Sequence, residues 1–142
     1  MSIQNSRIVL DTNVWIYGLR RDQIYPQCEE LLDKLRMFRV IIPRQVLFEL
    51  QVNLSPQEYQ QFWQLINAYP AQIEVSWDPA PQDRLDRYRQ LGCRKGDAAV
   101  AALTEHVEAE VLVRENRELL RDVSNLPFRL VSSTELLAEL ER

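Results

Sequence analysis

The stretch that decides the fold is Arg7–Gly18, which reads RIVLDTNVWIYG. Its consecutive aliphatic residues favour a short strand buried on both faces. The polarity then changes abruptly at Asp11-Thr12-Asn13, and an apolar segment suited to a helix over residues 12–19 follows. Ligands of open α/β sheets bind at the C-terminal ends of the strands, so Asp11 is placed for chemistry. Asp11 is equally suited to be a helix N-cap, and only further carboxylates at the same edge would favour the chemical role.

The length and composition predict one globular domain over residues 1–142. Of these residues, 46% are hydrophobic and 27% are charged, as in ordinary globular proteins. The net charge of −4 argues against binding nucleic acid through bulk positive charge. Cys28 and Cys93 are isolated, which indicates buried thiols and fits the cytoplasm. We see no leader and no apolar run of membrane-spanning length, so no membrane association is expected.

Short aliphatic strands alternate with helical patterns along the rest of the chain. Further strands are predicted at residues 40–42, 73–75, 111–113 and 128–131, and further helices at 24–38, 44–53, 55–69, 83–91, 97–103 and 132–140. Gly18 is expected to close the first helix, and Pro43 to occupy the first position of a later one. This alternation predicts a three-layer α/β/α fold around a central, mostly parallel sheet.

Two segments carry clear helix-start signals, Ser55–Glu58 and Ser132–Glu135, which are capping boxes. The helix that begins after Ser55 also carries an aromatic stripe that includes Tyr59, Phe62 and Trp63. Such a stripe is usually core. Its size leaves open that part of it forms a groove, with the helix of residues 24–38, for a partner's helix or a homodimer contact.

Carboxylates are the main candidates for chemistry. Familiar nucleophile and phosphate-loop motifs are missing, the single histidine, His106, is expected near a helix end, and the cysteines are too few for structural zinc. Four acids stand out: Asp11 and Glu115 each follow a predicted strand, Glu49 lies in the helix after one, and Asp97 starts a helix. In a parallel sheet with right-handed crossovers, such positions share one edge. Clustered carboxylates need a proton or a cation, and oxygen ligands favour Mg²⁺ or Mn²⁺, ions that assist phosphodiester cleavage.

Several motifs together resemble PIN-domain ribonucleases. They are VLDTN at residues 9–13, LFEL at 47–50, GDA at 96–98 and LVRENR at 112–117. Their order and spacing match the family from about residue 7 to residue 134. Small members are commonly VapC-type toxins of toxin–antitoxin pairs. The resemblance therefore implies an endoribonuclease dependent on Mg²⁺ or Mn²⁺, with RNA as substrate and a small antitoxin as partner.

The resemblance also implies roles for individual residues. Asp11, Glu49 and Asp97 fall on the family's metal-binding acids. The side chains implied to order the site are Thr12, Asn13 and Asn116, and those implied to contact RNA phosphates are Arg114, Arg117, Arg94 and Lys95.

The fourth acid is where the chain departs from the family. Asn116 stands where the family often has aspartate, so Glu115 is expected to substitute for it, with Glu118 as the fallback. This departure motivates an alternative, a PIN-fold module that binds RNA or protein and has weakened or lost catalysis.

Overall fold

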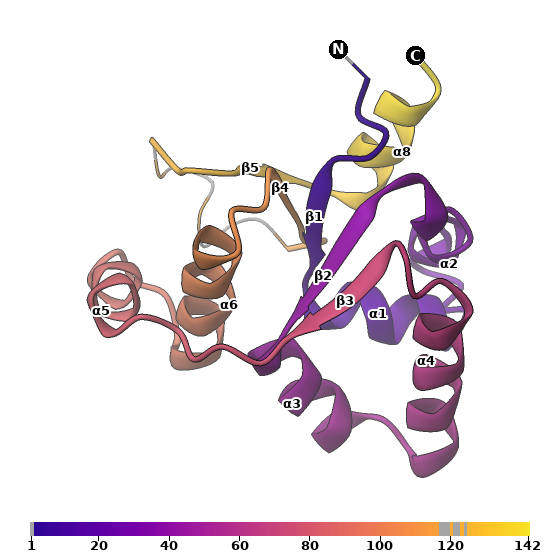
Figure 1. Ribbon diagram of the computed structural model, residues 1–142, viewed down its shortest axis with the longest axis horizontal. Coiled ribbons are helices and arrows are strands. Elements are labelled where there is room, and N and C mark those ends of the chain that lie inside the picture. The colour runs from indigo at the N-terminus through magenta and orange to yellow at the C-terminus, as the bar shows by residue number, and fades with distance from the viewer. Residues whose placement is uncertain (1, 117–119, 121–122, 124) are drawn as a thin grey trace.

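A five-stranded parallel sheet forms the centre of the computed structural model, which describes residues 2–116, 120, 123 and 125–142. The strand order is β3-β2-β1-β4-β5, and every adjacent pair is parallel (Figure 1). The strands are β1 (Arg7–Leu10), β2 (Arg39–Pro43), β3 (Ile73–Ser76), β4 (Val111–Val113) and β5 (Arg129–Val131). The predicted parallel sheet is therefore confirmed.

Helices cover both faces of this sheet. On one side lie α1 (Thr12–Leu19), α2 (Pro26–Leu32) and α4 (Pro56–Ala68), and on the other lie α5 (Gln82–Gln90) and α6 (Lys95–His106) (Figure 1). Two further α-helices are α3 (Arg44–Asn53), which contacts both α1 and α6, and α8 (Ser133–Leu140), which packs against α2. This is the predicted three-layer α/β/α fold.

The core is one continuous apolar cluster in which the central strands are buried on both faces. Ile8, Val9 and Leu10 of β1 are all fully inaccessible to solvent. Trp15 and Phe62 meet edge to face at 5.2 Å between ring centroids, which ties α1 to α4. The predicted aromatic stripe of α4 is thus partly core, because Phe62 is fully buried. Among the described residues, no helix is long and apolar enough to span a bilayer.

Most predicted elements are present, but the predicted helix of residues 24–38 is wrong. The chain instead forms α2 and then, after a break, the short 3-10 helix η1 (Leu35–Met37). Pro26 fixes the start of α2, and Lys34 leaves helical geometry with φ −116° and ψ 14°. The break lets Leu35 and Phe38 reach the core with 1% and 0% of their surface exposed. Core packing therefore overrides the helical spacing of the leucines.

Two smaller expectations also differ from the structure. Gly18 lies inside α1, buried against α2, and does not close the helix. Pro43 is the last residue of β2 and precedes α3 as its N-cap, one position before the predicted one. Both capping boxes are confirmed, at Ser55 and at Ser132.

Candidate functional site

The strand order creates a switch point between β1 and β4. The chain leaves β1 for β2 on one side, and the neighbouring strand β4 pairs with β5 on the other. Ligands of open α/β sheets bind in the crevice beyond the strands at such a point. Asp11 follows β1 directly and Arg114 follows β4 directly. A carboxylate and a guanidinium therefore meet where the topology favours a site.

Arg114 forms ion pairs with two of the predicted acids. Its Nε lies 3.1 Å from Oδ2 of Asp11, and its Nη2 lies 3.3 Å from Oδ1 of Asp97. Asp97 is the third residue of α6, so this helix brings it to the end of β4. Arg114 and Asp11 are each only 8% exposed. The predicted phosphate contact Arg114 is thus buried among the acids instead of facing solvent.

Glu49 reaches the same place from α3 and is held there by two neighbours. Its Oε1 accepts a hydrogen bond from the Thr12 hydroxyl at 2.5 Å, and its Oε2 accepts one from the Gln45 side chain at 3.0 Å. Gly96 makes room for it, because a Cβ at this glycine would lie 3.0 Å from Oε2 of Glu49. Thr12 and Gln45 therefore fix the position of the Glu49 carboxylate.

Burial dominates the electrostatics of Asp11. Desolvation raises the pKa of its carboxyl from 3.8 to about 6, although Arg114 and the backbone N–H of Thr12 act to lower it. Glu49 and Asp97 raise it further by charge repulsion. The three acids therefore interact, as the sequence predicted, and the cluster favours any added positive charge.

Glu115, the fourth predicted acid, makes its hydrogen bonds elsewhere. Its carboxylate accepts hydrogen bonds from the side chain of Gln27 at 3.0 Å and the backbone N–H of Ser133 at 3.2 Å. The Cys28 thiol donates to it at 3.6 Å between sulfur and oxygen, and burial raises the pKa of this thiol to about 12, so that it stays protonated. Glu115 therefore links β4 to α2 and α8, and its contacts do not join it to the other three acids.

The remaining predicted site residues are solvent-exposed or lie outside the described part. Asn13, Asn116, Arg94 and Lys95 are exposed. Arg94 and Lys95 stand at the start of α6, close in sequence to Asp97. Arg117 and Glu118 lie outside the described residues. The predicted helix-end position of His106 is confirmed, and its Nε2 lies 3.1 Å from Oδ2 of Asp78.

The donor chemistry of the acid cluster suits a hard divalent cation, because Asp11, Glu49 and Asp97 offer only carboxylate oxygens. The observed arrangement of these three side chains, however, does not form a site for such a cation. Within the part of the chain that the structure describes, no three acidic, histidine or cysteine side chains are grouped to hold one ion. Arg114 already pairs with two of the acids. A divalent cation would fit these residues only with the guanidinium displaced.

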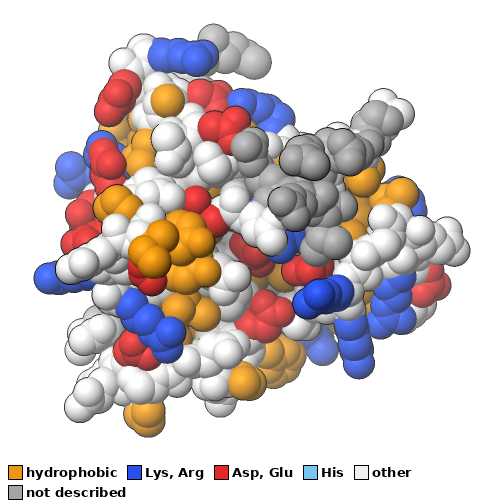
Figure 2. All heavy atoms as spheres, turned by 180° about the vertical axis from the view of Figure 1, so that it is seen from behind, with side chains coloured by type: hydrophobic (Ala, Val, Ile, Leu, Met, Phe, Trp, Pro, Cys, Tyr) orange, Lys and Arg blue, Asp and Glu red, His pale blue; other side chains and the backbone are white. Residues whose placement is uncertain are grey.

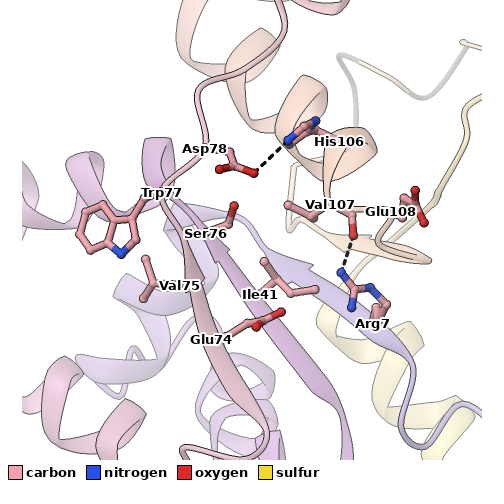
Figure 3. Close-up of a pocket in the computed structure, with 10 residues that line it drawn as sticks. All are labelled: Arg7, Ile41, Glu74, Val75, Ser76, Trp77, Asp78, His106, Val107 and Glu108. Atoms are coloured by element: carbon pink, nitrogen blue, oxygen red, sulfur yellow. Dashed lines mark hydrogen bonds and ion pairs between the residues drawn. The ribbon is translucent and has the colours of Figure 1, made fainter.

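A cavity of about 660 Å³ lies away from this cluster, beside β3 and the end of α6 (Figure 3). Two polar contacts occur within its lining. Arg7 donates a hydrogen bond to the backbone oxygen of Val107 at 2.6 Å, and His106 contacts Asp78. Glu74, Asp78 and Glu108 make the lining predominantly acidic. This cavity therefore suits RNA phosphates poorly.

A model of the PIN domain matches residues 8–126, most of the chain, including every residue of the acid cluster. The chain belongs to the PIN-domain family. The resemblance seen in the sequence motifs is thereby confirmed. A search of curated proteins found no match.

Solved structures support the same fold for this PIN domain. FitAcB from Neisseria gonorrhoeae matches with a TM-score of 0.62 and 15% identity, over 89% of this chain and 98% of the other. VapBC2 from Rickettsia felis, bound to a DNA fragment from their promoter, matches with a TM-score of 0.62 and 20% identity, again over 89% of this chain and 98% of the other. PAE2754 from Pyrobaculum aerophilum gives 0.53 and 17% over the whole of both chains. At these identities the likeness concerns the fold alone.

Three contributors to the PIN-domain site were not predicted from the sequence in their observed roles. Gln45 lies one helical turn before Glu49, a spacing at which side chains meet. Gly96 permits the close approach of that acid. Arg114 follows a buried strand just as Asp11 does, and applying the strand-end rule to both would have placed them together.

Proposed function

We propose that this PIN domain hydrolyses RNA phosphodiester bonds as the toxin of a toxin–antitoxin pair, acting in the cytoplasm. Asp11, Glu49 and Asp97 would hold Mg²⁺ or Mn²⁺. Such a cation, when bound, supplies charge neutralisation at the phosphate and activation of water. The observation that carries the proposal is the convergence of three acids from three separate elements at the switch point of the sheet.

The other residues of the site support this role by positioning and by charge. Thr12 and Gln45 hold the Glu49 carboxylate in one orientation, which spares the site the entropy of ordering it during reaction. Burial of Asp11 strengthens its attraction for cations. Arg94 and Lys95, exposed at the start of α6, are placed to contact phosphates that flank the cleaved bond.

A small antitoxin is the proposed protein partner. The support is that FitAcB and VapBC2 share the fold of this chain. A small reading frame beside the gene that encodes a DNA-binding protein would identify the antitoxin, and copurification with this chain would test it.

RNA cleavage by the purified, partner-free protein tests the proposal. Wild-type protein should cut single-stranded RNA with Mg²⁺ or Mn²⁺ and stop when EDTA is added. Asp11→Asn and Asp97→Asn should each lower the rate roughly 100-fold or more, because a site that loses one acid holds a cation poorly. Asp78→Asn, which changes an exposed aspartate beside the separate cavity, is the matched control and should cut normally. Equal rates for all four proteins would refute the site.

A second candidate is a PIN-fold module that binds RNA or protein with little or no catalysis. The pairing of Arg114 with Asp11 and Asp97 favours it, because the acids are already partly neutralised. The position of Glu115 also favours it, since its contacts lie with α2 and α8. RNA that binds in an anisotropy assay and stays intact with millimolar Mn²⁺ would support this candidate over the nuclease.

A further inference from the structure

We propose that Arg114 competes with divalent cations for Asp11 and Asp97, so that the metal site forms only when its guanidinium moves away. This inference rests on the proposed function and concerns the control of that same site. In the absence of metal, Arg114 supplies the positive charge that pairs with Asp11 and Asp97.

The guanidinium of Arg114 occupies the space that a bridging cation would need. One guanidinium lies 3.1 Å from an oxygen of Asp11 and 3.3 Å from an oxygen of Asp97, so it stands between two acids from different elements. A cation that bridged the same two acids would need this space. The guanidinium and the divalent cation cannot occupy this space together, because their like charges repel.

The pairing of Arg114 with Asp11 is incomplete. Within the described residues, the buried Nε atom of Arg114 makes no hydrogen bond, although it lies within ion-pair distance of Asp11. A buried donor without a partner costs free energy and offsets part of what the ion pairs contribute. Three acids against one guanidinium also leave an excess of negative charge. Arg114 therefore neutralises the cluster only partly, and a divalent cation can replace it.

A purely structural role for Arg114 predicts the opposite effect on metal binding. If the arginine served to hold Asp11 and Asp97 in the geometry that a cation requires, its removal would scatter the acids and weaken binding. If it competes with the cation, its removal strengthens binding. The direction of the change in metal affinity decides between the two roles without any measurement of cleavage.

Titration of Mn²⁺ by calorimetry into the full chain provides the test. Arg114→Met keeps the length and apolar stem of the side chain and removes the charge. It should bind Mn²⁺ at least tenfold more tightly than wild type. Arg36→Met, which removes an exposed charge from η1 just before β2, at the opposite end of the strands, is the matched control and should change affinity less than twofold. Equal or weaker binding by Arg114→Met than by wild type would overturn the proposal.

A measurement on the wild type covers the case in which Arg114→Met does not fold. In ¹⁵N NMR spectra, the Arg114 Nε–H signal should shift in step with added Mg²⁺, because the guanidinium leaves Asp11. A signal that stays fixed while Mg²⁺ saturates the site would overturn the proposal.

These outcomes separate this inference from the proposed function. Tighter Mn²⁺ binding by Arg114→Met with no RNA cleavage by any variant would support competition and overturn the nuclease. RNA cleavage by wild type, together with equal Mn²⁺ affinities of wild type and Arg114→Met, would support the nuclease and overturn the competition. If neither wild type nor Arg114→Met bound Mn²⁺ at millimolar concentration, the nuclease proposal and the competition proposal would both be overturned.

Discussion

At the scale of single residues, Asp11 shows how burial and neighbouring charge set the properties of the site. Its position was predictable from the sequence, because a carboxylate after an aliphatic strand lies at the ligand-binding edge of an α/β sheet. Its surroundings were not predictable in the same way. The pairing with Arg114 depends on which strands are neighbours, and β1 and β4 are about a hundred residues apart in the chain.

The raised pKa of Asp11 predicts how stability depends on pH in metal-free protein. Because the pKa is 3.8 in the unfolded chain and about 6 when folded, the folded state binds the proton more readily. Stability should therefore rise as pH falls from 7 to 5, by about 1 kcal/mol, out of at most about 3 kcal/mol for the full difference. Urea denaturation in EDTA at several pH values would measure this rise.

Asp11→Asn supplies the control for that measurement. The variant cannot titrate at this position, so its stability should change less between pH 7 and pH 5, and it should be the more stable protein at pH 7. A wild type that loses stability over this range, in parallel with Asp11→Asn, would contradict the assigned environment of Asp11.

Gly96 offers a second test at the scale of one residue. A Cβ there would lie 3.0 Å from Oε2 of Glu49, and Thr12 and Gln45 restrict how far this carboxylate can shift. Gly96→Ala should therefore slow RNA cleavage roughly tenfold. Stability should change by less than about 1 kcal/mol, because the preference of a helix for alanine over glycine offsets the close contact with Glu49. Unchanged cleavage would mean that the observed position of Glu49 is not required.

At the scale of secondary-structure elements, local signals in the sequence succeeded where they act within one element. The capping boxes at Ser55 and Ser132 are formed by residues close in sequence, and both helices start there. The failure at residues 24–38 arose from tertiary packing, since the chain breaks after α2 to bury Leu35 and Phe38. Helical spacing alone cannot report such a break.

The contact between α1 and α2 gives a test at this scale. A Cβ at Gly18 would lie 2.4 Å from Cδ1 of Leu32 and 3.0 Å from the backbone oxygen of Cys28. Gly18→Ala should destabilise the protein by about 1–3 kcal/mol through overpacking. In a Leu32→Ala background, the same change should cost less, because the nearest clash is gone. Equal costs in both backgrounds, measured by urea denaturation, would argue against this contact.

At the scale of the whole molecule, the sheet topology assembles the candidate site from distant segments. Asp11 at the N-cap of α1, Glu49 of α3 and Asp97 of α6 converge because parallel strands share one C-terminal edge. The alternation of strands and helices made this convergence predictable from the sequence. The different direction taken by Glu115 was not predictable, because it depends on how α2 and α8 pack beside β4.

The overall charge of the protein limits how it can hold RNA. The net charge is −4, and acidic and basic side chains are interspersed on the face shown in Figure 2. In the metal-free protein, Arg114 is paired with acids and so is not free to bind phosphates. Among the described predicted phosphate contacts, this leaves Arg94 and Lys95, at the start of α6. RNA binding should therefore depend on a few local contacts.

The dependence of RNA affinity on salt concentration tests this limit. Each phosphate neutralised on a single strand contributes about −0.7 to the slope of log K against log salt, so two contacts predict a slope of about −1.4. Ala substitution of both Arg94 and Lys95 should bring the slope close to zero and weaken binding at low salt. The matched control substitutes Arg36 and Arg39, which are exposed before and at the start of β2, at the opposite end of the strands, and should leave the slope unchanged. Anisotropy titrations in EDTA with a non-cleavable RNA analogue would measure all three slopes. A steep slope that neither pair of substitutions reduces would place the RNA on a different surface, because counterion release follows the phosphates that the protein contacts.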